Sequence, residues 1–287
     1  MKPEIIDIHP HIISTDTVRY PIAPQQGHRS NWSATRPVTF ERLIEEMDEA
    51  GVAKAAIVHS STTYGHNNAY VADCVAKHPD RFTGVYSFDL LAVDALSTFD
   101  YWLAHGMGGI RLFTGGATHQ NDGSWLVAPA TFPIWERCAQ EEMTMVVQTT
   151  LAGLSMVVAL AERFPKVRIA LDHCARPVLD DGPPYAACAE LFALAAFDNV
   201  YLKITPRTFD LAQAAPGGAE AFFPHLVKVF GADHLAFGSN YPASAGPLEK
   251  LIEQGHACFT SLTEDERAWV WGRTAKTLYP MLAGAAS

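Results

Sequence analysis

The 287-residue sequence has few of the features that would tie a protein to a membrane, a nucleic acid or an oxidising compartment. No apolar run is long enough to span a bilayer, and the first residues do not combine a basic leader, an apolar stretch and a small-residue cleavage site. Lys and Arg total 21 against 31 Asp and Glu, which gives a net charge of −10 without a basic cluster. We therefore expect a cytoplasmic protein with neither a nucleic acid nor a membrane as its partner.

Cysteine is also scarce, and its spacing carries no pattern. The five Cys residues are scattered and never form C-x-x-C, which argues against a disulfide framework or a zinc knuckle. Reduced cysteines fit a cytoplasmic protein.

Several motifs of known chemistry are missing. No G-x-S-x-G or H-E-x-x-H occurs, so an α/β serine hydrolase and a zincin lack support. No G-x-G-x-x-G follows the first apolar run and no G-x-x-x-x-G-K-[ST] occurs, which removes the usual reason for an open nucleotide-binding sheet.

What the sequence does contain is a regular alternation of short apolar runs with longer helical patterns. Continuous apolar runs are typical of parallel strands that are covered on both faces. Eight such runs predict strands at Glu4–His9, Ala53–His59, Phe82–Phe88, Gly109–Phe113, Thr144–Gln148, Val167–Asp172, Val200–Ile204 and His234–Gly238.

Helices are predicted between these runs, and two carry capping signals. Thr39 precedes a helix that Gly51 would end, and T-E-D-E from Thr263 to Glu266 has capping-box spacing for a C-terminal helix. The remaining helices are expected at Asn68–His78, Val93–His105, Phe132–Glu141, Leu154–Phe164, Tyr185–Ala196, Ala219–Phe230 and Gly246–Phe259. We predict one α/β domain over residues 1–287, a (β/α)8 TIM-like barrel whose chemistry lies at the C-terminal ends of its strands.

Three histidines stand at such predicted strand ends. The first strand ends in D-I-H-P-H, and residues two apart in extended chain point to the same side, so His9 and His11 would both face the barrel mouth. Neutral imidazoles there can bind a dication or direct a water molecule. His173 follows the sixth strand in L-D-H-C-A-R-P. The alternative for all three is a structural, hydrogen-bonded histidine.

Other polar residues lie at the same edge. Asn240, between Gly238 and Pro242, is presented by a tight turn, although Asn is also common in turns for local reasons. Arg111 lies in an apolar strand, where it would clamp a substrate carboxylate or pair with a structural carboxylate such as Asp89. Further pocket candidates are the polar loop 60–68 and, more weakly, Arg207.

In order along the chain, these motifs resemble the amidohydrolase-related metal-dependent hydrolases, and most closely the branch of 2-pyrone-4,6-dicarboxylate and sugar-acid lactonases. The segments that carry the resemblance are H-P-H, R-Y-P-I-A-P, V-H-S-S-T-T-Y-G-H-N-N, G-I-R-L, L-D-H-C-A-R-P, G-S-N-Y-P and the closing W-G-R-T-A-K-T-L-Y. The resemblance implies a distorted barrel that hydrolyses a lactone or, in a sister branch, decarboxylates an aromatic or unsaturated acid without oxidation. It also implies central roles for the three histidines, a clamping role for Arg111, and pocket roles for Ser61 and Tyr64.

Two departures from the family pattern lower the expected metal affinity. The fifth strand, which usually ends in His, reads V-V-Q-T-T with Gln148 and Thr150, and the eighth ends in Asn240 where the family usually has Asp. We therefore expect a divalent metal, with zinc first, to be weakly bound by His9 and His11 or absent. Asn240 is compatible with a natural variant, lost activity or an engineered replacement.

The sequence thus predicts an enzyme that opens a lactone or related ester of a small carboxylated ring by water attack. Without a metal a histidine must act as base, and His173 is the first choice. The alternatives are a metal-dependent decarboxylase and a catalytically dead ligand-binding barrel, and a homo-oligomer is compatible with the sequence. The expected catalytic residues are His9, His11, His173 and Asn240, and the expected substrate-binding residues are Arg111, Ser61, Tyr64, Gln148 and Arg207.

Overall fold

The computed structural model describes residues 3–115 and 123–284. Its centre is a sheet of eight strands in which every neighbouring pair is parallel and the order follows the chain from β1 to β8. The strands are β1 (Ile5–Asp7), β2 (Val52–Val58), β3 (Phe82–Tyr86), β4 (Met107–Phe113), β5 (Thr144–Gln148), β6 (Arg168–Leu171), β7 (Val200–Ile204) and β8 (Leu235–Phe237).

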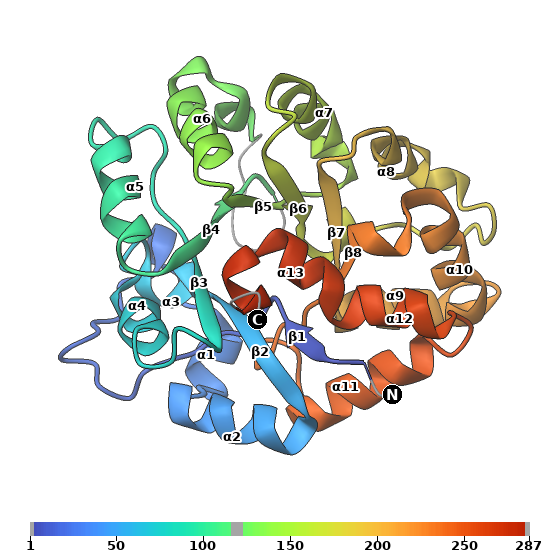
Figure 1. Cartoon of the computed structure of the whole chain (residues 1–287), viewed down its shortest axis with the longest axis horizontal. Helices are drawn as coiled ribbons and strands as arrows, with labels where there is room; N and C mark the ends of the chain where they lie inside the picture. The colour runs from blue at the N-terminus through green and yellow to red at the C-terminus, as the bar shows by residue number, and fades with distance from the viewer. Residues whose placement is uncertain (1–2, 116–122, 285–287) are drawn as a thin grey trace.

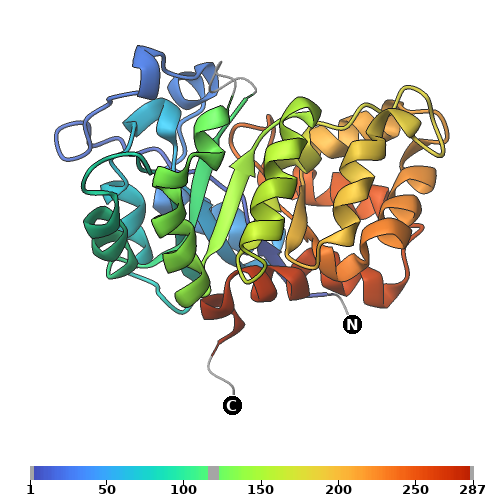
Figure 2. The ribbon, with the colours of Figure 1, turned by 90° about the horizontal axis from the view of Figure 1, so that it is seen from above.

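Backbone contacts beyond β1 and β8 bring the two edges of this sheet together. The amide of Ile8 donates to the carbonyl of Phe237 at 3.2 Å, and the amide of His11 donates to Tyr241 at 2.7 Å. The sheet is therefore a nearly closed barrel with helices outside it, as Figures 1 and 2 show. This confirms the predicted TIM-barrel fold.

The helices lie around the barrel, and both predicted capping signals are present. Thr39 accepts a hydrogen bond from the amide of Arg42, Gly51 ends that helix in the left-handed region, and Thr263 and Glu266 form a capping box. The helices are α1 (Asn31–Thr35), α2 (Phe40–Ala50), α3 (Ser61–Tyr64), α4 (Ala69–Val75), α5 (Ala95–Leu103), α6 (Phe132–Gln140), α7 (Leu154–Arg163), α8 (Ala189–Ala193), α9 (Pro206–Ala214), α10 (Gly218–Phe230), α11 (Leu248–Cys258), α12 (Glu264–Ala268) and α13 (Thr274–Leu278).

The structure differs from the predicted helices at two places near the site. The single helix expected over Tyr185–Ala196 is broken into a short α8 flanked by 3-10 turns. Helix α9, which the sequence pattern did not predict, directly follows β7 and begins at Pro206, whose fixed φ suits the first turn of a helix.

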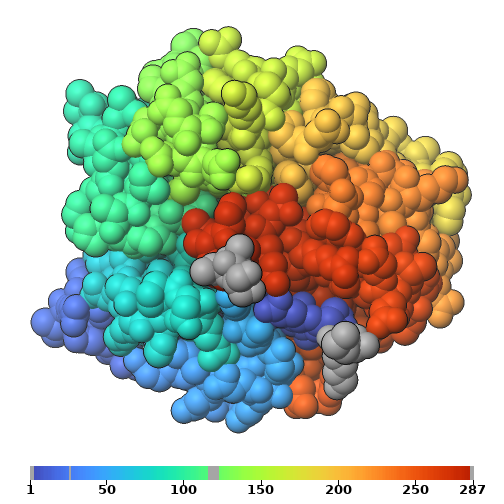
Figure 3. Space-filling model, viewed as in Figure 1, coloured from blue at the N-terminus to red at the C-terminus, as the bar shows by residue number. Residues whose placement is uncertain are grey.

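The C-terminal segment closes the N-terminal end of the barrel. Ala275, Leu278 and Tyr279 are buried against the residues that fill the barrel interior, and the hydroxyl of Thr144 in β5 donates to the carbonyl of Leu278. In Figure 1 helix α13 lies across the barrel axis, and in Figure 3 the same segment fills the centre of that face. Access to the barrel interior is therefore from the opposite end, where the strands end.

In the described part of the chain, no helix is long and apolar enough to cross a membrane. All five cysteines are buried and unpaired, as the sequence predicts.

Candidate active site

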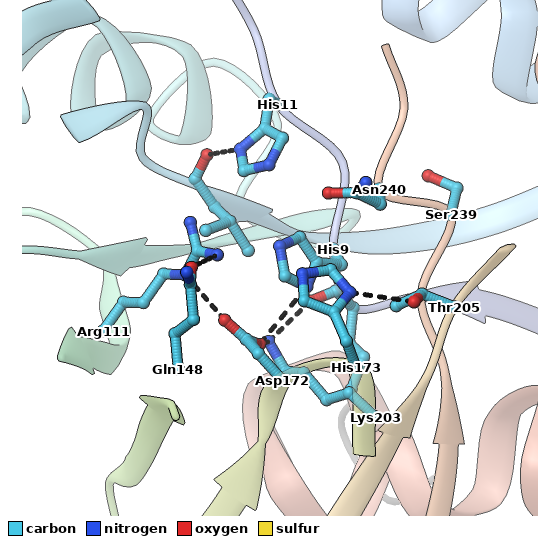
Figure 4. Close-up of polar contacts among 12 residues, drawn as sticks. His9, His11, Arg111, Gln148, Asp172, His173, Lys203, Thr205, Ser239 and Asn240 are labelled. Carbon is cyan, nitrogen blue, oxygen red and sulfur yellow. Dashed lines mark hydrogen bonds and ion pairs between the residues drawn. The ribbon is translucent and has the colours of Figure 1, made fainter. Parts of the chain in front are cut away.

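A buried charge network lies where β4, β6 and β7 approach one another inside the barrel. Asp172, directly after β6, has one carboxylate oxygen 2.8 Å from Nε of Arg111 and the other 3.2 Å from Nζ of Lys203 (Figure 4). Burial alone would raise the pKa of Asp172, but the two cations outweigh it and hold the pKa well below its ordinary value. The carboxylate is therefore ionised and fixed between two positive charges.

The three predicted histidines converge above this network. The ring centroid of His9 lies 5.1 Å from that of His11 and 5.1 Å from that of His173. His11 and His173 line a cavity, whereas His9 is fully buried beneath them and its Nδ1 lies 3.3 Å from Asp172 Oδ1. The strand β1 ends at Asp7, so His9 and His11 lie in the segment beyond it, and of the two only His11 lines the cavity.

The hydrogen bonds of these rings decide which nitrogen is free. Nδ1 of His11 lies 2.8 Å from the carbonyl oxygen of Val58, which can only accept, so this nitrogen carries the proton and Nε2 keeps a lone pair. Nδ1 of His173 lies 2.8 Å from the hydroxyl of Thr205, which can donate or accept. The tautomer of His11 is thus fixed by its surroundings, and that of His173 is not.

All three imidazoles are neutral near pH 7. Burial, together with the nearby Arg111, lowers the pKa of His11 to about 3. Burial also lowers the pKa of His173 to about 3, against the opposing effect of Asp172, and lowers that of His9 well below its ordinary value. A neutral imidazole can accept a proton from water or act as a metal ligand.

A left-handed turn positions His173. The four residues from His173 to Arg176 all have φ between 51° and 58°, a region that non-glycine residues seldom occupy. Two of them, His173 and Arg176, line the same cavity. Backbone strain of this kind is concentrated at functional sites, where the surrounding packing must hold it in place.

The cavity in front of the histidines has a volume of about 190 Å³ and is rich in arginine. Arg111, Arg176 and Arg207 line it, and none of the described residues that line it is a carboxylate. Nε of Arg176 is buried without a hydrogen-bond partner, and no ion pair forms to Arg176 or Arg207 in the described residues. Burial lowers the pKa of Arg176 and Arg207 adds to this, so the two guanidinium groups are close enough to repel each other. An anion between them would relieve that repulsion.

A second cavity of about 240 Å³ shares Arg111 and Phe113 with the first. It is lined by Gln25, His66 and Asp89, and the carboxylate of Asp89 makes it a poorer host for an anion. Of the three predicted histidines, His11 and His173 line the smaller cavity and none lines the larger one, so we take the smaller cavity as the candidate active site.

Arg111 and Gln148 line the cavity but are also held by the protein. Nε of Arg111 donates to Asp172, and Nη2 donates to Oε1 of Gln148 at 2.9 Å. The structural carboxylate that the sequence analysis allowed for is thus Asp172, not Asp89. Arg111 has less hydrogen-bonding capacity left for a substrate than Arg176 has.

Of the other predicted residues, three line the cavity and one does not. Asn240, at φ 52° in the loop after β8, lines the cavity and donates to the hydroxyl of Ser244 at 3.1 Å. Ser61 also lines it, with a buried Oγ that has no hydrogen-bond partner. Arg207 lines it from the first turn of α9. Tyr64 lies outside the lining, and its hydroxyl accepts the amide of Ser14 at 2.7 Å.

Three residues at this site were absent from the sequence prediction. Asp172 and Arg176 lie inside the motif L-D-H-C-A-R-P, of which only His173 was singled out. Lys203 lies inside the apolar strand V-Y-L-K-I, and its full burial is as unusual for Lys as Arg111 is for Arg. A charged residue within an apolar strand is the signal that could have found it.

One cluster in the described residues has the ligand types for a metal ion. Ligand atoms of His9, Asp172 and His173 all lie within 4.8 Å of one another. Both ring nitrogens of His9 and Oδ1 of Asp172 are buried without a well-directed hydrogen bond, which fits a site that can take an additional group. Two imidazoles and a carboxylate are a ligand set that zinc accepts. The set differs from the expected His9 and His11, since it contains Asp172 and His173 and does not contain His11.

Comparison with known proteins agrees with this geometry. A sequence profile of the family described as Amidohydrolase matches residues 6–281. The chain belongs to the amidohydrolase family. This confirms the resemblance drawn from the motifs. An L-fucono-1,5-lactonase from Burkholderia ambifaria is 28% identical over 170 residues, 55% of this chain and 57% of the relative. The match therefore spans little more than half the length of that curated relative.

Solved structures show the same barrel over nearly the whole chain. A Pseudomonas putida protein provisionally named a 2-pyrone-4,6-dicarboxylic acid hydrolase has a TM-score of 0.77 at 20% identity, covering 98% of this chain and 99% of its own. A zinc-bound amidohydrolase from Burkholderia multivorans has a TM-score of 0.76 at 19% identity, with 96% and 99% covered. A 2,6-dihydroxybenzoate decarboxylase has a TM-score of 0.67 at 15% identity, with 98% and 99% covered. At these identities the likeness establishes the fold.

Proposed function

We propose that this protein hydrolyses a lactone whose ring carries a carboxylate. The observation that supports this most directly is the joint lining of one cavity by neutral histidines and by two arginines that have no counter-ion in the described part of the chain. The names of the relatives add a reaction type, since a curated relative is a lactonase and a structural neighbour is provisionally named a hydrolase of a pyrone dicarboxylate.

The arginines favour an acidic ring over a neutral sugar lactone. A carboxylate between Arg176 and Arg207 would neutralise two like charges and complete the hydrogen bonding of the buried Nε of Arg176. A neutral sugar lactone offers only hydroxyl groups to the same pair. Arg111 can add attraction at the cavity wall while it stays bonded to Asp172.

His11 is the base that the contacts support best, in place of His173. Its Nδ1–H is fixed on Val58, so the lone pair of Nε2 is available to a water molecule in the cavity. The low pKa of His11 makes it a weak base in the free protein. The negative charge of a bound substrate, and of the oxyanion that forms, would raise that pKa toward the range in which the ring holds a proton.

The reaction then follows as an addition and an elimination. The water oxygen bonds to the lactone carbonyl carbon while its proton passes to Nε2 of His11, and the carbonyl electrons move to the oxygen. The hydroxyl of Ser61, which has no partner in the structure, can donate to that oxyanion. The carbonyl then re-forms, the bond to the ring oxygen breaks, and the proton on His11 passes to the departing alkoxide. The product is the open hydroxy acid.

Asn240 is able to orient the water but not to deprotonate it. Its amide nitrogen donates to Ser244, which leaves the amide oxygen as an acceptor at the cavity. If a dication is held by His9, Asp172 and His173, it supplies Lewis-acid polarisation of the carbonyl. The roles of His11, Ser61 and the arginines are the same in either case.

A lactone screen tests the proposal. The panel contains a pyrone dicarboxylate, a saturated lactone with one carboxylate, L-fucono-1,5-lactone and unsubstituted δ-valerolactone, with proton release followed by a pH indicator. We expect turnover of the carboxylated lactones with kcat/KM at least about tenfold above that of the neutral ones, since a charge-assisted hydrogen bond contributes about 1.5–3 kcal/mol. Equal turnover of acidic and neutral lactones would contradict the arginine argument, and no turnover with measurable binding would support a ligand-binding barrel.

A structural neighbour that is a decarboxylase makes that reaction the second candidate. The same purified protein is incubated with aromatic and unsaturated acids while carbon dioxide is measured. Carbon dioxide release without lactone hydrolysis would replace our proposal with decarboxylation.

A further inference from the structure

The proposed reaction makes no use of Lys203, although its side chain is fully buried in the middle of the site. Its ammonium lies 3.2 Å from Oδ1 of Asp172 and 3.3 Å from the carbonyl oxygen of Ile8 (Figure 4). An ammonium group is strongly hydrated in water, so burying one is costly unless it has a specific electrostatic partner. Asp172 is that partner.

The oxygen that Lys203 contacts also faces the candidate metal cluster. Oδ1 of Asp172 lies 3.3 Å from Nδ1 of His9, and His9, Asp172 and His173 are the only described group whose ligand atoms gather closely enough to hold an ion. A dication bound there would need Asp172 as its one anionic ligand. Lys203 and the dication would therefore compete for the same carboxylate.

The charges around Asp172 favour the lysine. Asp172 contributes one negative charge, whereas Lys203 and Arg111 contribute one positive charge each and contact both of its oxygens. Asn240 is neutral, and the lining of the cavity contains no carboxylate among residues 3–115 and 123–284. Asp7, a further buried carboxyl group near Lys203, accepts the amides of His9 and Ser239 and is not part of the cluster that could hold an ion. A dication at Asp172 would therefore meet two cations on the one carboxylate that it would bind.

We propose that Lys203 is the resident cation of this site and a built-in competitor of a metal ion: its ammonium holds Asp172 and keeps the affinity of the His9, Asp172 and His173 cluster for a dication low. This inference concerns the protein alone and does not depend on which substrate is turned over. It places the cause of weak metal binding in β7, in addition to Asn240 in the loop after β8.

The test is zinc binding by the chelator-treated, full-length protein, measured by titration calorimetry and elemental analysis. Lys203→Met keeps the length and apolar stem of the side chain but removes the ammonium. Because one unit charge a few ångströms away opposes a dication strongly at an effective dielectric constant of ~20, we expect at least about tenfold tighter zinc binding by Lys203→Met. The matched control is Lys276→Met, which removes a surface ammonium paired with Glu4 at the closed end of the barrel and should bind zinc as the unmodified protein does.

A second variant covers the case in which Lys203→Met does not fold. Lys203→Gln is neutral and its amide can still donate to Ile8 or Asp172, so it should fold and also bind zinc more tightly. Zinc-soaked crystals of the unmodified protein add a readout that needs no variant, since bound zinc should displace the ammonium from Asp172.

Two results would overturn the proposal. One is equal zinc affinity of the unmodified protein and of folded Lys203→Met or Lys203→Gln. The other is a zinc ion ligated by Asp172 in the unmodified protein while Lys203 remains 3.2 Å from the same oxygen. Tighter zinc binding by Lys276→Met as well would reduce the effect to net charge and would also count against it.

Discussion

The two ends of the barrel are built from different chemistry. At the closed end, Leu278, Tyr279 and Leu282 are buried against aliphatic residues of the strands, and strand ends are covered by apolar packing. At the open end, Asp172, Lys203 and three histidines are equally buried but meet one another through charges and hydrogen bonds. Burial of side chains is thus common to both ends, and it is the burial of ionisable side chains that indicates a functional site.

The largest effect is expected from removing the charge at the centre of the open end. Asp172→Asn leaves two buried cations, Lys203 and Arg111, without their counter-ion. Breaking one partner of a buried ion network typically costs about 3–5 kcal/mol of unfolding free energy. Urea denaturation should show a loss of this size together with a fall in kcat for the folded fraction. A change below about 1 kcal/mol would mean that Asp172 does not carry the charge we assign to it.

Acid should act on the same end. Burial lowers the pKa of His59 to about 4 and those of His11 and His173 to about 3, against about 6.5 when unfolded. Because the unfolded chain binds these protons first, stability is fully present above about pH 6.5 and is lost as pH falls toward the folded values.

The buried His9 belongs with these three, because its pKa is also lowered well below its ordinary value. Well below pH 6.5 each of the four histidines contributes a loss that approaches about 1.4 kcal/mol per pH unit, so the slope approaches about 5 kcal/mol per unit and is about half of that near pH 6.5. Urea titrations of the chelated protein at pH 7.0, 6.0 and 5.5 measure this slope. Replacing His59, which lies outside the cavity lining, by Gln should make the slope shallower by about a quarter. A flat profile between pH 7.0 and 5.5 would mean that these rings protonate in the folded state.

At the closed end we expect a substitution to lower stability without lowering activity. Leu278→Ala removes a fully buried side chain from the segment that seals the barrel, and changes of this type cost about 2–5 kcal/mol. We expect a lower urea midpoint but an unchanged kcat per folded molecule. A fall in kcat at a concentration of urea where the variant is fully folded would show that the two ends are coupled.

The hydrophobic pattern of the sequence predicted some strands and helices accurately and missed others. Thr144–Gln148 and Val200–Ile204 have the same bounds in the structure as in the prediction, because each is a continuous apolar run between polar segments. Helix α9 was missed, since its first turn reads P-R-T and lacks an early apolar stripe. The pattern of hydrophobicity thus located most of the barrel, but not every element around its mouth.

Part of the candidate site was predicted from the positions of residues relative to the strands, not from hydrophobicity. His11, His173 and Asn240 follow strands, and parallel strands in a barrel bring their ends together, so position along the chain was sufficient to group them. The link of Asp172 to Lys203 and Arg111 could not be predicted in this way. These residues are 31 and 61 positions apart, and only the register between strands brings their charged groups into contact.

A smaller effect is expected at the rim of the open end. Arg176→Met and Arg207→Met each remove one of two guanidinium groups that have no counter-ion among the residues that the structure describes. Each should raise KM for a carboxylated lactone by about tenfold, with little change for δ-valerolactone and little loss of stability, because one charge-assisted hydrogen bond is lost in each case. Steady-state kinetics with both substrates makes the comparison. Equal changes in KM for the acidic and the neutral lactone would show that the arginines shape the cavity without binding the anion.

The central claim is that the open end is a hydrolytic centre in which a neutral His11 accepts the proton of water. The most direct measurement is kcat on the best carboxylated lactone for the unmodified protein and for His11→Gln, whose amide nitrogen can still donate to Val58. The account predicts a loss of about 10²–10⁴ in kcat with KM within a few-fold of its original value, as expected when general-base catalysis is removed. Full kcat in His11→Gln would contradict it.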